Sequence, residues 1–112
     1  MTQLRLSIVV AVHNMRREVR RTLKTLTAEY QDIRRDCYEL IVVENGSSEP
    51  LGEASVSAID PSFQYRWSEP GDPSPAAAIN AAVRQSRGEA VAVLARKVRP
   101  RPRALAPRAH AK

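Results

Sequence analysis

Two near-continuous runs of aliphatic and β-branched residues constrain the fold more than any other feature of this sequence. Leu6–Val12 and Glu39–Val43 each contain a single polar residue. Strands that are apolar throughout are covered on both faces, which is typical of parallel sheets. Two shorter apolar segments, Phe63–Trp67 and Ala90–Leu94, are expected to add two further strands.

Helical patterns lie between these runs. Ala76–Ser86 is rich in alanine and predicts a helix, and residues 51–59 are compatible with a short one. The element order is therefore β-α-β-(α)-β-α-β, which predicts an α/β fold with a mostly parallel sheet and helices on both faces. In the first helical region, apolar residues recur at steps of three and four and predict one buried helical face: Val19, Leu23, Leu26, Tyr30 and Ile33. The opposite face is expected to be solvated: Arg20, Arg21, Lys24 and Glu29.

The composition changes abruptly after Leu94. The chain has 112 residues and a net charge of +6, yet residues 1–94 hold 11 basic and 12 acidic groups, and residues 95–112 hold seven basic and no acidic ones. The last segment also has three prolines and only two large aliphatic residues, too few to order itself by burial. We expect residues 1–94 to form one half-domain and residues 95–112 to be a disordered basic tail.

Three interpretations of the tail remain open. It is a basic arm that binds nucleic acid or an anionic surface, a solvated extension, or the product of out-of-frame translation. The third is favoured, because arginine, proline and alanine codons are those of a G+C-rich gene read in the wrong frame. Nucleic-acid binding is disfavoured, since the tail lacks the aromatic residues that stack on bases.

The cysteine count and the hydropathy bear on the compartment. The single cysteine, Cys37, excludes an internal disulfide, fits a reducing compartment and is interpreted as a small buried hydrophobe. No stretch approaches the roughly 20 apolar residues that span a bilayer. We therefore expect a cytoplasmic protein without a transmembrane segment.

Polar loops follow the first two strands, at His13–Glu18 and Glu44–Ser48. The carboxyl ends of parallel strands share one edge of the sheet, where such folds bind ligands. The Glu44 carboxylate can accept hydrogen bonds from a nucleobase or a ribose there, or it can stabilise the turn; His13 and Asn14 can likewise bond nearby backbone. There is no dinucleotide or P-loop glycine motif and no cluster with metal-ligand spacing, so no catalytic or metal residue is assigned.

Four segments, in order, resemble the start of a family 2 glycosyltransferase of the GT-A fold. Ser7–Asn14 is similar to the family's opening strand, and Glu18, Leu23 and Leu26 match its first helix. Tyr38–Ser47 resembles the strand that ends Val-Asp-(Asp/Asn)-Gly-Ser, with Glu44 in the place of the nucleotide-binding Asp. Ala76–Leu94 resembles the helix, glycine turn and strand that precede the family's metal site.

The resemblance implies that the domain binds the nucleotide of a UDP- or GDP-sugar. Main chain at Val12 and His13 would line the base pocket, Glu44 would contact the base and Asn80 would help to shape the pocket. Two departures are that Val12–His13 lacks the usual Pro-x-Tyr and that Met15 stands where many members have Glu. The full set of nucleotide-binding residues that we predict is Val12, His13, Asn14, Glu44, Asn45 and Asn80.

In the full-length family an Asp-x-Asp motif follows this last strand and holds Mg²⁺ or Mn²⁺ against the donor diphosphate. Here the corresponding residues are Ala95, Arg96 and Lys97. We therefore predict that the chain lacks the metal and acceptor sites, carries no cofactor and is inactive alone, with Ala90–Leu94 left as an exposed sheet edge. The alternatives are a non-catalytic nucleotide-binding or interaction module with a nucleic-acid-binding arm, and a flavodoxin-like domain whose loops bind no ligand.

Overall fold

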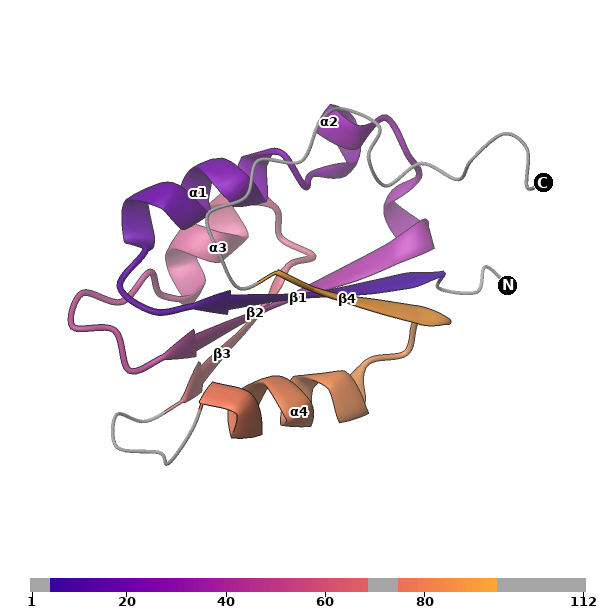
Figure 1. Ribbon diagram of the computed structural model, residues 1–112. Helices are drawn as coiled ribbons and strands as arrows, with labels where there is room; N and C mark the ends of the chain where they lie inside the picture. Colours follow the sequence, from indigo (N-terminus) through magenta and orange to yellow (C-terminus); the bar gives the residue numbers. More distant parts are fainter. Residues whose placement is uncertain (1–4, 69–74, 95–112) are drawn as a thin grey trace.

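Four parallel strands form one sheet in the computed structural model, which describes residues 5–68 and 75–94 (Figure 1). The strands are β1 (Leu6–Val12), β2 (Tyr38–Asn45), β3 (Gln64–Ser68) and β4 (Ala90–Leu94), in the spatial order β3-β2-β1-β4. Every neighbouring pair is parallel. The predicted α/β class and the four strands are confirmed.

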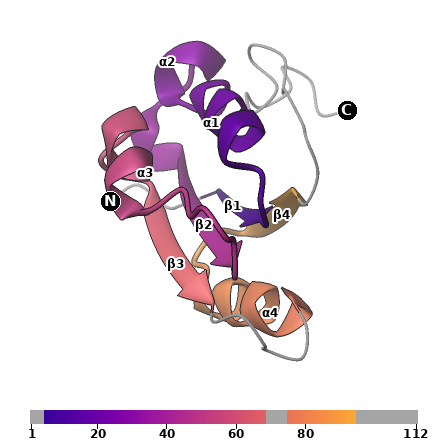
Figure 2. The same cartoon turned by 90° about the vertical axis from the view of Figure 1, so that its left-hand side faces the viewer.

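Helices cover both faces of this sheet, as predicted. The helices α1 (Arg16–Lys24) and α3 (Glu53–Ile59) lie on one face and α4 (Pro75–Gln85) lies on the other (Figures 1 and 2). The chain steps outward from β1 to β3 and then returns past β1 to β4. Because such crossovers are right-handed, the returning helix is placed on the opposite face.

The alternation of side chains along the strands divides the core between the two faces. On the first face, Ile8, Val10 and Val12 of β1 and Leu40 and Val42 of β2 pack in one cluster with Val19 and Leu23 of α1 and Val56 of α3. On the second face, the intervening strand residues Val9, Ile41 and Val43 pack against Ala82 and the partly buried Ile79 of α4. Continuous apolar strands therefore serve two cores, as the sequence indicated.

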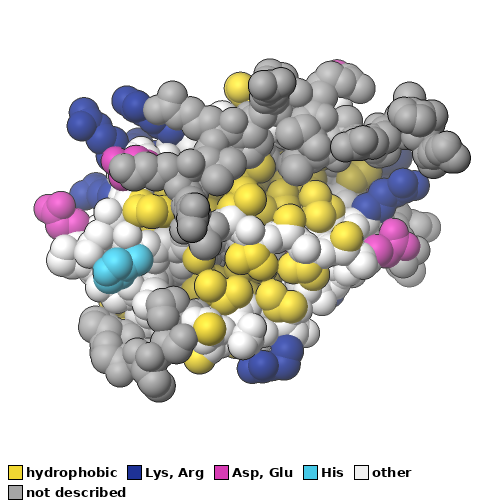
Figure 3. Space-filling model, viewed as in Figure 1, with side chains coloured by type: hydrophobic (Ala, Val, Ile, Leu, Met, Phe, Trp, Pro, Cys, Tyr) yellow, Lys and Arg dark blue, Asp and Glu magenta, His cyan; other side chains and the backbone are white. Residues whose placement is uncertain are grey.

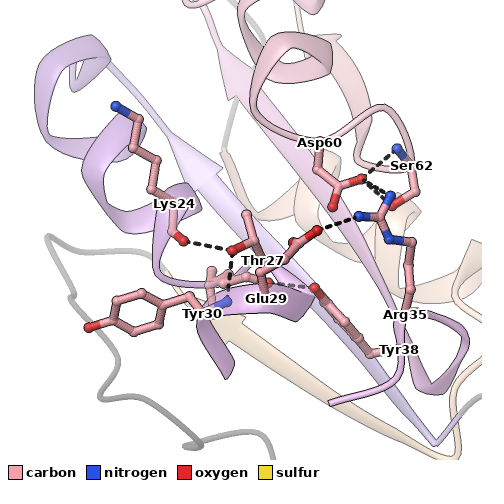
Figure 4. Close-up of polar contacts among 9 residues, drawn as sticks. Lys24, Thr27, Glu29, Tyr30, Arg35, Tyr38, Asp60 and Ser62 are labelled. Carbon is pink, nitrogen blue, oxygen red and sulfur yellow. Dashed lines mark hydrogen bonds and ion pairs between the residues drawn. The ribbon is translucent and has the colours of Figure 1, made fainter. Parts of the chain in front are cut away.

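The first helical region is broken, where the sequence predicted one face from Val19 to Ile33. Helix α1 ends at Lys24, and the short helix α2 (Ala28–Gln31) begins after Thr27. The Thr27 Oγ1 donates to the Lys24 carbonyl at 3.0 Å and accepts from the Tyr30 amide at 3.3 Å (Figure 4). A threonine that bonds backbone on both sides ends one helix and caps the next.

The break changes which side chain is buried. Tyr30 is 41% exposed, whereas Gln31 is fully buried and its Nε2 donates to the Thr25 carbonyl at 2.7 Å. The prediction that Tyr30 belongs to the buried face is wrong, because the helical period does not continue through the break. The 3₁₀ turn η1 (Arg35–Cys37) then leads into β2, and its Cys37 is only half-buried.

Strand β4 is an edge strand of the described sheet, as predicted. Among residues 5–68 and 75–94 it pairs only with β1, and Val91 and Val93 are 40% and 45% exposed. Val93 is paired with Val9 and so faces the α4 side, but α4 packs over β1 and β2. Figure 3 shows hydrophobic side chains gathered in the centre of this view, over β4. None of the described helices is long and apolar enough to cross a membrane.

Candidate functional site

The two polar loops meet at the carboxyl edge of the sheet, where Asn14 joins them. Its backbone amide donates to Ser47 Oγ at 2.9 Å. Its side-chain Oδ1 accepts from the Ser48 backbone amide at 2.9 Å and from Ser48 Oγ at 3.2 Å. Asn14 adopts a left-handed conformation with φ of 52°, which asparagine tolerates better than most residues. Asn14 therefore joins the two loops through both its backbone and its side chain.

His13 is oriented by the same pair of loops. Its Nδ1 donates to the Asn45 carbonyl at 2.6 Å, and its Nε2 accepts from Asn14 Nδ2 at 3.2 Å. A carbonyl oxygen only accepts, so a proton lies on Nδ1 in this arrangement. The imidazole is held beside the end of β2.

A small pocket of about 270 Å³ opens beside these loops. It lies at the ends of β1 and β2, next to the point where the strand order reverses, which is where open α/β sheets bind ligands. Ligand pockets usually measure about 300–1,000 Å³, so this one suits one planar ring of a larger ligand. Its walls are mostly apolar, and the lining residues are Ala11, Val12, His13, Met15, Val43, Asn45 and Ile79.

Strand register places Asn45, and not Glu44, at this pocket. Asn45 shares the α4 face of β2 with Val43, and both line the pocket. Glu44 points to the opposite face, the side of Leu40 and Val42, because neighbouring residues in a strand alternate.

Glu44 is fully buried, and backbone and side-chain donors surround its carboxylate. The Leu51 amide donates to both oxygens at 2.9 Å, the Gly52 amide donates to Oε1 at 3.4 Å, and the Tyr65 hydroxyl donates to Oε1 at 2.6 Å. Burial raises the pKa of Tyr65, and the hydrogen bond to Glu44 raises it further. These contacts match the turn-stabilising alternative, and a direct contact of Glu44 with a base stays a prediction that requires the carboxylate to leave these donors.

Asn80 lies on the exposed side of α4 and is not among the pocket-lining residues, whereas its neighbour Ile79 is. Ile79 lines the pocket although it was not a predicted site residue. Met15 lines it too, although the sequence indicated it only as a departure from the family pattern. A signal for Ile79 was present, because Ala78, Ile79, Ala82 and Val83 form an apolar stripe at helical spacing and must face the sheet.

A second polar cluster lies at the amino end of the sheet. Ser7 Oγ and the Arg87 amide both donate to Glu39 Oε2 at 2.6 Å, Gln64 Nε2 donates to Oε1 at 3.3 Å, and the Gly88 amide donates to Ser7 Oγ at 2.8 Å. Burial opposes ionisation of Glu39, but the hydrogen bonds outweigh it and lower its pKa. This cluster bonds to itself and holds the turn before β4.

Comparison with known proteins identifies the family. The model of the family described as Glycosyl transferase family 2 matches residues 7–102, which is most of the chain. This chain is a member of glycosyltransferase family 2. The matched range continues past Leu94 into the segment that the sequence analysis treats as a tail.

Two solved structures share the glycosyltransferase fold with this chain. One is the crystal structure of residues 1–349 of TarS from S. aureus, with a TM-score of 0.66, 21% identity and 82% of this chain covered. The other is the mannosyltransferase PcManGT from Pyrobaculum calidifontis in complex with GDP-Man and Mn²⁺, with a TM-score of 0.62, 24% identity and 81% covered. This chain spans 27% of the length of each. No curated protein matches it.

The described residues do not fit a divalent cation such as the Mn²⁺ in the PcManGT structure. Within the described ranges, no group of three His, Cys, Asp or Glu residues could hold a metal ion. The positions at which the resemblance expects acidic ligands are Ala95, Arg96 and Lys97, which lie outside the described residues and carry no oxygen donor in their side chains.

Proposed function

We propose that this chain supplies the nucleotide-binding edge of a sugar transferase, with a UDP- or GDP-sugar as the donor. The observation that carries the proposal is the pocket at the ends of β1 and β2, built from two loops that Asn14 joins and lying inside the range matched by the family. PcManGT holds GDP-Man in its own structure, which supports a nucleotide sugar as the ligand class.

Each predicted residue has a part in the proposal. Main chain at Val12 and His13 lines the base pocket, and the Asn45 side chain supplies a donor and an acceptor to the base. Asn14 holds the two loops together. Glu44 fixes the segment that leads to Leu51, and its direct contact with the base forms part of the proposal that variants must test.

Asn80 is the remaining member of the predicted set. The family resemblance assigns it to the pocket wall, whereas Ile79 occupies that position here. We keep Asn80 as a candidate whose contribution is measured directly against that of Asn45.

Sugar transfer itself requires a charge-stabilising group that the described residues do not supply. A donor diphosphate needs cations or donors to stabilise its developing charge, and the described residues hold no metal-ligand group. The chain also spans 27% of its structural neighbours. We therefore propose that residues 1–94 bind the donor weakly without metal and are inactive alone, and that residues 95–112 are a separate segment. A cytoplasmic location belongs to the same proposal.

Isothermal titration of the full chain with UDP- and GDP-sugars, with and without Mn²⁺, tests this function. We expect weak binding that Mn²⁺ does not change. Asn45→Ala should lower the affinity about fivefold, the value of one hydrogen bond, and leave its backbone bond to His13 intact. Asn80→Ala is the matched variant: an equal loss would place Asn80 in the pocket, and no loss would leave Ile79 as the wall.

Absence of binding by a chain that is folded by circular dichroism would overturn the proposal. Salt-dependent binding to DNA that requires residues 95–112 would then favour the interaction-module alternative.

A further inference from the structure

Helix α1 concentrates positive charge on one side. Five of its nine residues are basic, all five are exposed, and at 100° per residue they occupy an arc of about 140°. The α1 basic stripe consists of Arg16, Arg17, Arg20, Arg21 and Lys24. The only acidic residue of α1, Glu18, falls outside that arc.

This arrangement is unfavourable for a helix that only faces water. The stripe contains three pairs of like charges at i,i+4 spacing, and such pairs destabilise isolated helices. Arg16 and Arg17 also lie in the first turn, at the positive end of the helix dipole, where anions are favoured. A negatively charged surface placed against the stripe relieves both effects.

The stripe is a local feature. Outside α1, the described residues hold six basic and nine acidic side chains. Figure 3 shows basic side chains gathered over α1. Three of these acids, Glu39, Glu44 and Asp60, are buried, so the remaining described surface carries equal numbers of acidic and basic side chains. The stripe therefore sets the orientation in which this part of the chain approaches a polyanion.

Hollows lined by stripe residues flank the helix. One of about 440 Å³ is lined by Arg16, Arg17 and Arg20, by the acids Glu18 and Glu49, and by Asn14 and Ser48. Another of about 550 Å³ is lined by Arg20 and Lys24, with Ser55 as a neutral donor. The second hollow has cations with no acidic residue beside them, so it suits a phosphate-bearing headgroup better than the first.

We propose that the α1 basic stripe docks the protein on a membrane surface that contains anionic lipid. The stripe is a convex helix side about 13 Å long, and α1 has no aromatic residue on which a base could stack, so a nucleic acid fits it less well. Tyr30, 41% exposed on α2 just beyond the stripe, is a residue type that favours the headgroup level. In Figure 4, Thr27 lies between Lys24 and Tyr30.

Docking through α1 sets the position of the candidate nucleotide pocket as well. Arg16 begins α1 two residues after Asn14, and both line the same hollow. The carboxyl edge of the sheet is therefore held beside the membrane surface. The inference does not rest on the proposed nucleotide ligand, since it is argued from the charges of α1 and is tested without any nucleotide.

Flotation of the full chain with phosphatidylcholine vesicles, with and without phosphatidylserine, tests the proposal. Wild type should bind only the anionic vesicles, and raised salt should weaken binding. Arg17→Gln/Arg20→Gln should lower the partition coefficient about 10- to 30-fold. The matched control is Arg5→Gln/Arg84→Gln, which removes the same charge from exposed positions outside α1 and should leave partitioning near the wild-type value.

Equal losses in the two double variants would overturn the proposal, because net charge or residues 95–112 would then explain the binding. No loss in the α1 variant, or no vesicle binding by wild type, would also overturn it. Loss of oligonucleotide binding with vesicle binding retained would assign the stripe to nucleic acid instead. If the α1 variant melts earlier than the control, Arg21→Gln/Lys24→Gln replaces it with the same expectations.

Discussion

The two ends of strand β2 carry the same residue type with different consequences. Glu39 at the amino end and Glu44 near the carboxyl end are both buried acids that accept several hydrogen bonds. Around Glu39 the polar cluster closes on itself beneath a tight turn. Around Glu44 the donors are Leu51 and Gly52 of the loop after β2 and Tyr65 of β3, and the nearby end of β2 carries Asn45, which lines a pocket together with His13.

The comparison of Glu39 with Glu44 shows that a buried carboxylate does not by itself mark a binding site. Glu39 and Glu44 differ by an odd number of residues and so lie on opposite faces of the sheet. What distinguishes the carboxyl end is the hollow beside Asn45, which follows from the crossover of the chain to β4. The amino end should then govern stability, and the carboxyl end should govern ligand binding.

The largest expected effect is on stability, at Gly88. A Cβ there would lie 2.6 Å from the Ser7 amide nitrogen and 2.7 Å from the Leu6 carbonyl carbon, both backbone atoms that cannot yield. Gly88→Ala should lower the free energy of unfolding by about 3 kcal/mol, measured by urea denaturation. Gly52→Ala, at the carboxyl end, is the control: its φ is 84° but nothing lies within 4 Å, so it should cost about 1–2 kcal/mol. Equal costs would contradict the close approach at Gly88.

Glu39→Gln should cost about 2 kcal/mol, because it removes a charged acceptor from the Ser7 hydroxyl and the Arg87 amide. The cost should depend on pH. The pKa of Glu39 is lowered in the folded state from a usual value of 4.5, so its stabilisation is present above about pH 4.5 and is lost as the pH falls through the folded pKa. Urea midpoints of the two proteins should therefore converge in acid. A gap that widens in acid would show that the carboxylate is not the favoured form.

Asn14→Ala should cost about 1.5 kcal/mol, through loss of the bonds from Ser48 and strain at positive φ. It should also weaken nucleotide-sugar binding, because the loops separate. Asn14→Gly restores the conformational freedom but not the side-chain bonds. It should recover part of the stability and none of the affinity, measured by thermal melting and titration. Full recovery of affinity would mean that loop geometry depends on the backbone alone.

Tyr65→Phe is expected to have the smallest effect, about 1 kcal/mol from loss of the hydrogen bond to Glu44. Pairing it with Glu44→Gln in a double-mutant cycle measures the coupling of the two side chains. A coupling near zero in thermal melts would contradict the hydrogen bond and show that the Leu51 and Gly52 amides alone hold Glu44.

The sequence predicted the strands well, because uninterrupted β-branched runs have few alternatives to a doubly covered sheet. It also predicted that the loops after β1 and β2 meet. The helix break after Lys24 was not predicted, because the apolar period continues across Thr27. The hydroxyl groups of Thr25 and Thr27, which bond the last carbonyls of α1, end the helix there. The sequence also did not predict on which face of the sheet the pocket lies. The motif includes both Glu44 and Asn45, and only the strand register shows that Asn45 faces α4.

The central claim is that a nucleotide binds at the carboxyl edge of the sheet, on the α4 side. Amide chemical-shift mapping of the full chain during titration with UDP- and GDP-sugars tests it most directly. We expect amide chemical-shift changes at residues 11–15, 43–48 and 79, and none at Ser7, Glu39 or Gly88. Shifts confined to the amino end or to the α1 basic stripe, or none at saturating nucleotide sugar, would contradict it.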